Sequence, residues 1–343
     1  MIKESDFMKN DVLRRKEHEA VRNGVGYYDF THQVLDVKGK DAATFLDKVF
    51  VNDIKNMKKG HALYTTMLNE EGKIIDDVIV FRLEDDKYLI STLYIDKMIK
   101  WFDKFKGGCD IDYKDITSKL TMFALQGPKS RDLVNKIVDK DVSSMKFFTI
   151  EDNTVGDLDI MVARAGFTGE LGYELYVESA KKEVLEEKIK ECGKEFDLAN
   201  ITTDVIIGSL PGEKGYVLMS DLEGTNPLEV GYGWTVHWDS DFIGKDELLK
   251  AKGNIKRDLF GFELLGEGQV EAGDPVLCDG KEIGKVTKFT YGYTLEKFIG
   301  YCLIEKECAV EGKEVEIKTK AGSLKAKLCD RVFYDKENER VRG

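Results

Sequence analysis

Residues 276–304 read VLCDGKEIGKVTKFTYGYTLEKFIGYCLI, and their short runs of alternating apolar and polar residues are separated by glycines. Asp279-Gly280 is a typical β-hairpin turn, because both residues tolerate the positive φ angles that such turns require. The same pattern predicts strands at residues 259–264, 276–278, 283–288, 299–303, 314–317 and 324–327. Short strands at this regular spacing predict a C-terminal β-barrel or sandwich of about 80–90 residues.

The residues before this segment mix helical and strand patterns. Apolar residues at helical spacing predict helices near residues 8–24, 41–49, 95–105 and 180–196. Strand patterns at 74–83 and 88–92 are joined by Asp85-Asp86 into a hairpin. We therefore predict an α+β fold, in which a large body precedes the barrel. The 343 residues exceed the usual size of a single core, so more than one domain is expected.

The composition argues against several classes of protein. Lys and Arg number 52 against 64 Asp and Glu, and the net charge of −12 disfavours nonspecific binding to nucleic acid. No apolar run approaches the roughly 20 residues of a membrane span, and the polar first residues are unlike a signal peptide. We therefore expect a cytoplasmic protein without a membrane partner. The six cysteines form no C-x-x-C pair and the four histidines are scattered, so neither a disulfide framework nor a metal site is predicted.

Motifs for common cofactors and hydrolases are also missing. The sequence has no dinucleotide fingerprint, no phosphate-binding P-loop and no G-x-S-x-G nucleophile turn. Residues 69–80 (NEEGKIIDDVIV) instead place two carboxylates, Asp76 and Asp77, in an otherwise apolar strand, where they should face opposite sides. One interpretation is a pair of acids that cap a hairpin turn. The other is a carboxylate held in a dry pocket to stabilise a cation or accept a proton.

A second candidate site is the glycine-rich stretch of residues 164–174, RAGFTGELGYE. Its three glycines at three-residue spacing allow the backbone to approach a ligand closely. Glu174 follows at the start of a strand, and its carboxylate matches the N–C–N edge of a flat heterocycle. A plain hairpin loop with an exposed glutamate is the alternative.

Together these stretches resemble the aminomethyltransferase family, which comprises the T-protein of the glycine cleavage system and its folate-dependent demethylase relatives. The resemblance covers nearly the whole chain. It is carried by residues 26–32 (GYYDFTH), by Asn52-Asp53 and Gly60 before Tyr64, and by residues 71–77 (EGKIIDD), 126–128 (QGP), 164–172 (RAGFTGELG), 226–231 (NPLEVG) and 241–245 (DFIGK).

The resemblance implies a three-domain cloverleaf fold around a central hole that holds tetrahydrofolate. Residues 1–45 and 118–225 would form the folate-binding domain, residues 46–117 and 226–254 a second domain, and residues 255–343 the barrel. Asp77 would be the catalytic carboxylate, Glu174 would pair with the aminopyrimidine edge of the pterin, and Phe167 would lie near the pterin ring. The remaining residues implied to contact folate are Arg164, Tyr64, Ser91, Met67 and Glu213.

The chain departs from the family pattern where arginines hold the anionic folate tail. Residues 205–213 keep only Glu213 of the family run, and Asp335 replaces an arginine after Phe333-Tyr334. Ser91 stands where T-proteins carry an asparagine. We expect Arg164 or Lys214 to hold the tail instead.

The one-carbon donor stays open at the level of sequence. A T-protein takes an aminomethyl group from a lipoyl carrier protein, whereas a demethylase takes a methyl group from a small molecule. The departures favour a divergent, demethylase-like member. The alternative is a non-catalytic folate-binding protein with a regulatory or assembly role, against which the retained Asp77 argues. The sequence does not predict the oligomeric state.

Overall fold

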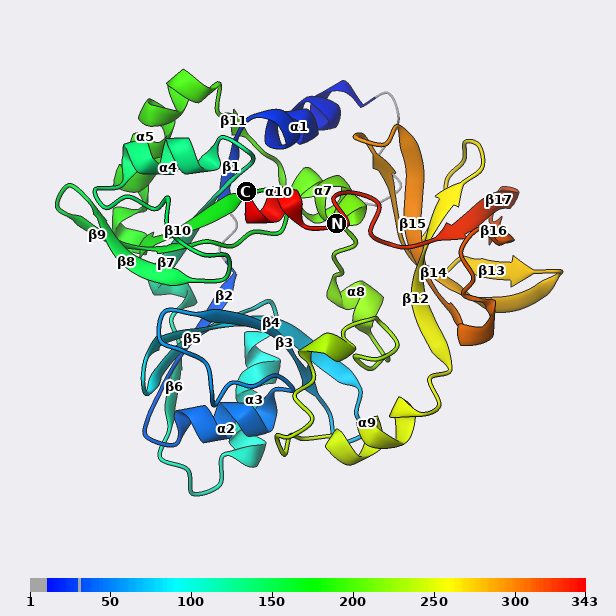
Figure 1. Ribbon diagram of the computed structural model, residues 1–343, viewed down its shortest axis with the longest axis horizontal. Helices are drawn as coiled ribbons and strands as arrows, with labels where there is room; N and C mark the ends of the chain where they lie inside the picture. Colours follow the sequence, from blue (N-terminus) through cyan, green and yellow to red (C-terminus); the bar gives the residue numbers. More distant parts are fainter. Residues whose placement is uncertain (1–10, 30–31) are drawn as a thin grey trace.

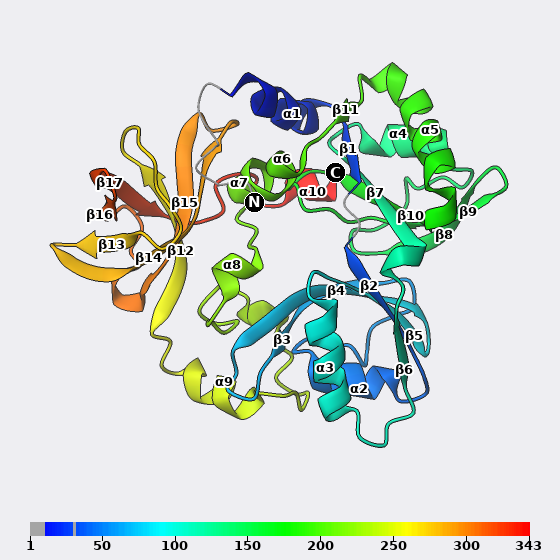
Figure 2. The ribbon, with the colours of Figure 1, turned by 180° about the vertical axis from the view of Figure 1, so that it is seen from behind.

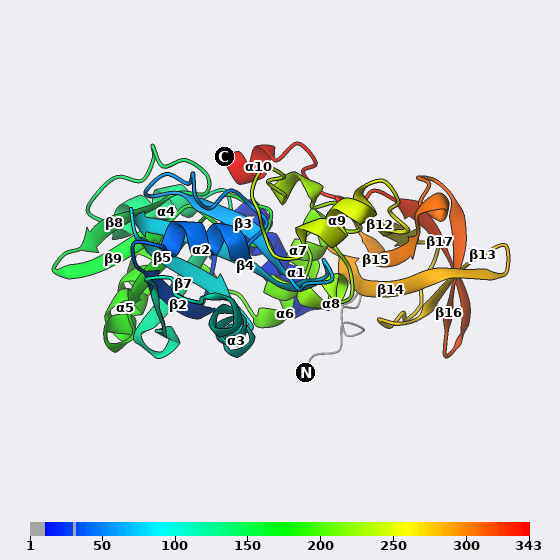
Figure 3. The ribbon, with the colours of Figure 1, turned by 90° about the horizontal axis from the view of Figure 1, so that it is seen from below.

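The computed structural model describes residues 11–29 and 32–343. Its strands form two open sheets and a closed barrel, and these are the cores of three lobes. Figure 1 shows the lobes around a middle region that contains α7 (Ser209–Lys214), α8 (Met219–Leu222) and the C-terminal α10 (Glu339–Arg342). The molecule is flattened when seen from below, with the barrel at the end opposite β8 and β9 (Figure 3).

The first sheet has the strand order β11-β1-β7-β10-β9-β8. All of its neighbouring strands run antiparallel except the parallel pair of β1 and β11. The helices α4 (Ser130–Ile137) and α5 (Lys182–Gly193) pack on it because their apolar residues recur at helical spacing, as Leu185 and Ile189 do. The strands are β1 (Gly26–Asp29), β7 (Leu120–Gln126), β8 (Ile150–Val155), β9 (Leu158–Ala163), β10 (Gly172–Glu178) and β11 (Ala199–Asn200).

The second sheet has the order β3-β4-β5-β2-β6. Helices α2 (Ala42–Val49) and α3 (Ile95–Phe105) bury Phe45 and Phe102 against it. The strands are β2 (Gln33–Lys38), β3 (Ala62–Leu68), β4 (Ile74–Glu84), β5 (Lys87–Thr92) and β6 (Asp112–Asp115). The predicted hairpin of β4 and β5 is therefore confirmed.

The C-terminal strands close into a barrel of order β12-β15-β14-β13-β16-β17, which decides between the predicted barrel and sandwich. α9 (Lys245–Lys252) leads into it (Figure 1). The α+β class and the barrel were thus predicted correctly. The strands are β12 (Arg257–Leu264), β13 (Pro275–Cys278), β14 (Lys281–Gly292), β15 (Lys297–Glu305), β16 (Glu314–Thr319) and β17 (Gly322–Cys329).

The remaining helices connect the lobes. α1 (Val12–Asn23) begins at Asp11, whose side chain accepts a hydrogen bond from the Arg14 backbone N–H and so caps the helix. The first residues of the predicted helix 8–24, and Phe30-Thr31 of the family motif, lie outside the described residues. α6 (Thr203–Ile207) and α7 lie between the barrel and the first-sheet lobe, as Figure 2 shows from behind. Single 3₁₀ turns occur at Thr117–Lys119, Ser179–Lys181, Lys194–Phe196, Gly233–Thr235 and Lys306–Cys308.

One predicted domain boundary needs correction. The prediction assigned residues 1–45 to the first domain, but β2 pairs with β5 and β6 in the second sheet. The chain crosses to the second sheet between Asp29 and Gln33, because the apolar residues of β2 and α2 complete the core of that sheet. The chain returns to the first sheet between Asp115, where β6 ends, and Leu120, where β7 begins.

Candidate active site

A cavity of about 570 Å³ lies where the lobes meet. Its wall is formed by strands of both open sheets, by the segment from α7 to Trp234, and by the C-terminal segment that follows the barrel. The volume is in the range of small-molecule sites. Six of the residues predicted to form the site contribute to this wall, namely Tyr64, Asp77, Ser91, Phe167, Glu174 and Lys214.

Asp77 is the fourth residue of β4, and its side chain does not bond to the turn that precedes this strand. The turn is held instead by Asn69, whose side chain accepts hydrogen bonds from the backbone N–H groups of Glu71 and Lys73. The Tyr64 hydroxyl donates to Asp77 Oδ2 at 3.0 Å from the neighbouring strand β3. Burial raises the pKa of Asp77 to about 6, although the Tyr64 hydrogen bond works to lower it. The interpretation of these acids as turn caps is therefore wrong.

Asp76 is fully buried and has its own set of donors. Its carboxylate accepts from the Thr92 hydroxyl at 2.6 Å and from the Asp77 backbone N–H at 2.9 Å. Burial raises the pKa of Asp76 to about 7. The two adjacent carboxyls thus have different partners, as expected for consecutive residues of a strand. Both of them border the cavity.

Glu174 lies on β10 and is only 6% exposed, so it is not the exposed glutamate of a plain hairpin loop. The Tyr176 hydroxyl donates to its carboxylate at 2.7 Å. Burial raises the pKa of Glu174 to about 7. Phe167 lies nearby in the wall and stacks on Tyr216, with ring centroids 5.4 Å apart. Phe167 and Tyr216 thus provide a flat apolar surface, and Glu174 provides a buried carboxylate with few hydrogen-bond donors around it.

The other three predicted site residues are not part of the cavity wall. Met67 is fully buried in the core of the second sheet, where an apolar side chain is better accommodated than at a polar site. The guanidinium of Arg164 donates to the backbone carbonyls of Met145 and Arg342. Glu213 is fully buried in an ion-pair network beside the cavity. Contact of these three side chains with a ligand in the cavity is therefore not supported.

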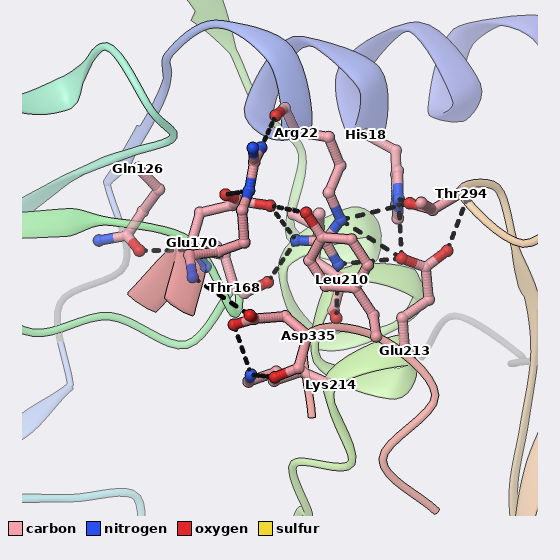
Figure 4. Close-up of polar contacts among 12 residues, drawn as sticks. His18, Arg22, Gln126, Thr168, Glu170, Leu210, Glu213, Lys214, Thr294 and Asp335 are labelled. Carbon is pink, nitrogen blue, oxygen red and sulfur yellow. Dashed lines mark hydrogen bonds and ion pairs between the residues drawn. The ribbon is translucent and has the colours of Figure 1, made fainter. Parts of the chain in front are cut away.

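The network around Glu213 joins distant parts of the chain (Figure 4). Arg22 of α1 forms ion pairs with Glu213 of α7 at 3.0 Å and with Glu170 at 3.2 Å, and its Nη1 donates to the Thr168 carbonyl at 2.7 Å. Glu170 also accepts from Arg340 Nε at 2.9 Å in the C-terminal segment. Because Thr168 and Glu170 follow directly after Phe167 in the chain, this network holds the segment that carries Phe167 although Arg22, Glu170 and Glu213 do not border the cavity.

Sequence reasoning missed several residues of the wall. His32 borders the cavity, and burial lowers its pKa to about 4, so its imidazole is neutral near pH 7. Trp234 is 71% exposed at the wall and stacks on Tyr64, with centroids 6.5 Å apart. Arg331 comes from the segment after the barrel. The Pro and Gly residues around 226–231 do indicate a loop at a binding rim before Trp234, but Arg331 has no local sequence signal.

The pKa of Glu174 predicts how the stability of the ligand-free protein depends on pH. Folding raises this pKa from 4.5 to about 7, so the contribution of Glu174 to the free energy of unfolding falls as the pH rises through this interval. We expect Glu174→Gln to raise the free energy of unfolding by about 2–3 kcal/mol at pH 8 and by less than about 1 kcal/mol at pH 5. Urea titrations at both pH values measure the difference.

Glu178→Gln is the matched control, because Glu178 is exposed at the end of the same strand. It should change the free energy of unfolding equally little at both pH values. A Glu174→Gln protein that is destabilised at pH 8, or stabilised equally at both pH values, would contradict the assignment of a strained, buried carboxylate.

Within residues 11–29 and 32–343, no group of three His, Cys, Asp or Glu side chains is arranged to hold a metal ion. No helix in the described part of the chain has the length and apolar character of a membrane span.

Comparisons with known proteins agree with the architecture. A family model for the GCVT N-terminal domain matches residues 6–240, and one for the glycine cleavage T-protein C-terminal barrel domain matches residues 257–335. A protein of Caldanaerobacter subterraneus described as an aminomethyltransferase is 37% identical over 328 residues, which cover 93% of this chain and 87% of that protein. An aminomethyltransferase of Clostridium botulinum is also 37% identical, over 94% of this chain and 90% of its own length.

A solved structure shares the fold. The glycine cleavage system aminomethyltransferase T from Bartonella henselae superposes with a TM-score of 0.86, covering 94% of this chain and 90% of that protein. Its sequence is 22% identical, so this likeness bears on the fold alone.

Proposed function

The chain belongs to the family of the glycine cleavage T-protein, and on this basis we propose that it transfers an aminomethyl group to tetrahydrofolate. The relatives described as aminomethyltransferases, which match almost the whole chain, support this choice over methyl transfer. Tetrahydrofolate would supply the nucleophilic nitrogens that accept the one-carbon unit. The bonds from this carbon to the lipoyl sulfur and to the amino nitrogen would both break, so the products would be methylene-tetrahydrofolate, ammonia and the carrier with its lipoyl dithiol free. A lipoyl carrier protein would be the donor.

The residues of the cavity fit such a ligand. The buried carboxylate of Glu174 has a single side-chain donor among the described residues, Tyr176, and so has unused acceptor capacity for the two N–H groups of an aminopyrimidine edge. Phe167 and Tyr216 offer flat apolar surfaces for a pterin ring. Ser91 is a hydroxyl donor and acceptor in the same wall.

The observation that carries the catalytic proposal is the Asp77 carboxylate, which is held by Tyr64 at the wall of this cavity. In a site that excludes water, an ionised Asp77 would orient the acceptor nitrogens and stabilise positive charge that develops on the transferred carbon. Its raised pKa also allows it to take up a proton near neutral pH. The neutral His32 would add no competing positive charge.

Identification of the product tests the proposal. The protein is incubated with tetrahydrofolate and a lipoyl carrier protein bearing the aminomethyl group, and the folate product is identified by mass spectrometry. We expect methylene-tetrahydrofolate and an equimolar amount of ammonia. Methyl-tetrahydrofolate formed from a small methyl donor would instead establish the demethylase reaction. Folate binding without turnover of either donor would support the non-catalytic alternative.

A further inference from the structure

The charges around the cavity are unevenly divided among the lobes. The first sheet contributes Glu174 and the second contributes Asp76 and Asp77. Four cations border the cavity, and they come from the connecting and C-terminal segments. They are Lys214, Arg331, Lys336 and Arg342.

Two of these cations already have carboxylate partners. Lys214 Nζ lies 2.8 Å from Asp335 Oδ2 in a pair whose side chains are 1% and 6% exposed. Asp335 therefore neutralises the lysine that the sequence suggested for an anionic tail. Lys336 is exposed and lies 3.6 Å from Asp330. Both lysines therefore already have part of their charge compensated by a carboxylate of the chain.

Arg331 is held in place without such a partner. Its Nε donates to the Gly215 carbonyl at 3.1 Å, and its Nη1 donates to the Val230 carbonyl at 2.6 Å. The guanidinium carbon lies 5.3 Å from the centre of the Tyr232 ring. No Asp or Glu of the described residues lies within ion-pair distance of it. Two of its five N–H groups are thus used, and the remaining three keep their fork geometry.

Two glycines in left-handed conformations lie beside this guanidinium and the residue that follows it. Gly231 has a φ angle of 71°, and a Cβ atom there would lie 3.4 Å from Arg331 Nη1. Gly215 has a φ of 78° and ends α7, and a Cβ atom at this position would meet Val332 at 2.8 Å. Two glycines in left-handed conformations therefore bring residues 331–332 against the cavity wall.

We propose that Arg331 binds a carboxylate of the ligand in this cavity. The inference rests on the proposed function for the nature of the ligand, and two sources of the carboxylate are chemically equivalent. One is the glutamate tail of tetrahydrofolate, which the proposed function supplies. The other is the carboxylate of a small amino-acid methyl donor, which would apply if the demethylase reaction took the place of transfer from a lipoyl carrier. A half-buried arginine that two carbonyls fix in place loses little side-chain entropy when it pairs, so the geometry favours bidentate recognition of a carboxylate.

Calorimetry with Arg331→Gln separates these sources. Tetrahydrofolate is compared with 6-methyltetrahydropterin, which lacks the glutamate tail, and N-methylglycine is the probe for a small carboxylate. If the tail is bound, the variant should lose about tenfold in affinity for tetrahydrofolate and less than twofold for the tailless pterin. If a donor carboxylate is bound, the variant should keep both of these affinities and lose about tenfold for N-methylglycine. Unchanged affinities for all three ligands would overturn the inference.

Three further variants make the result interpretable. Arg331→Lys keeps the charge and should recover part of the lost affinity, whereas a purely structural role would not distinguish lysine from glutamine once thermal melting shows both to be folded. Arg342→Gln removes an exposed cation of the same cavity and should have a smaller effect than Arg331→Gln. Glu174→Ala should lower the affinity for tetrahydrofolate and for the tailless pterin to the same extent. If it weakens neither, the folate proposal fails, and Arg331 is then judged by N-methylglycine alone.

Discussion

Replacement of Asp77 by asparagine is expected to lower kcat about 10³-fold, which corresponds to about 4 kcal/mol in activation free energy, while the affinity for tetrahydrofolate changes less than about fivefold. Asparagine keeps the shape of the side chain and can still accept the Tyr64 hydrogen bond through its amide oxygen. It removes the negative charge, and this charge is worth most when positive charge develops in the transition state. Single-turnover product formation and calorimetric binding measure the two quantities separately.

Asp76→Asn is the matched control for this prediction. Asp76 also borders the cavity, but its carboxylate is held by Thr92 and by the Asp77 backbone. We expect kcat to fall by less than about tenfold, because the asparagine oxygen can accept one of these hydrogen bonds. Equal losses for the two variants, or a loss of folate affinity as large as the loss of kcat in Asp77→Asn, would contradict a specific role of Asp77 in the chemical step.

Local patterns were sufficient to predict most of the elements, because strands and helices follow from the spacing of apolar residues. The hairpin of β4 and β5 and the barrel strands are examples. The predicted domain boundary at residue 45 was wrong because β2 is apolar enough to belong to either sheet. Only its pairing with β5 assigns it to the second sheet. Such long-range pairing leaves no local signal.

The site was harder to predict than the fold. Asp77 and Glu174 stand out because a carboxylate inside an apolar strand is unusual. Met67, Arg164 and Glu213 were implied by the family resemblance, but the orientation of a side chain depends on its tertiary partners. Lys214 is an example, because its ammonium pairs with Asp335, a residue 121 positions away in the sequence. Arg331 becomes a candidate only once that pair is known.

Arg22→Met is expected to lower the free energy of unfolding by about 3–5 kcal/mol at pH 7.5. Methionine preserves most of the volume, but it leaves the fully buried Glu213 without its guanidinium. Burial works to raise the pKa of Glu213, and in the native protein His18 and Arg22 outweigh this effect and hold that pKa below its ordinary range. Glu170 keeps Arg340 and the Tyr334 hydroxyl, so most of the loss should come from Glu213.

The pH dependence of this loss identifies its origin. A carboxyl whose folded-state pKa is lowered stabilises the protein above its unfolded pKa, and that stabilisation disappears as the pH falls towards the folded value. In Arg22→Met this contribution is already absent, so the difference between variant and native protein should shrink mainly as the pH falls below 4.5, the ordinary pKa of Glu213, towards its folded-state pKa of about 2.

Arg15→Gln serves as the control for Arg22→Met. Arg15 lies on the same helix, and its ion pair with Glu296 is partly exposed, with the glutamate side chain 58% accessible. We expect a loss of less than about 1 kcal/mol. A loss of this size for Arg22→Met as well would mean that the buried network contributes little stability. A large loss that does not depend on pH would attribute the effect to packing, and the cavity wall around Phe167 would then be positioned by contacts other than these charges.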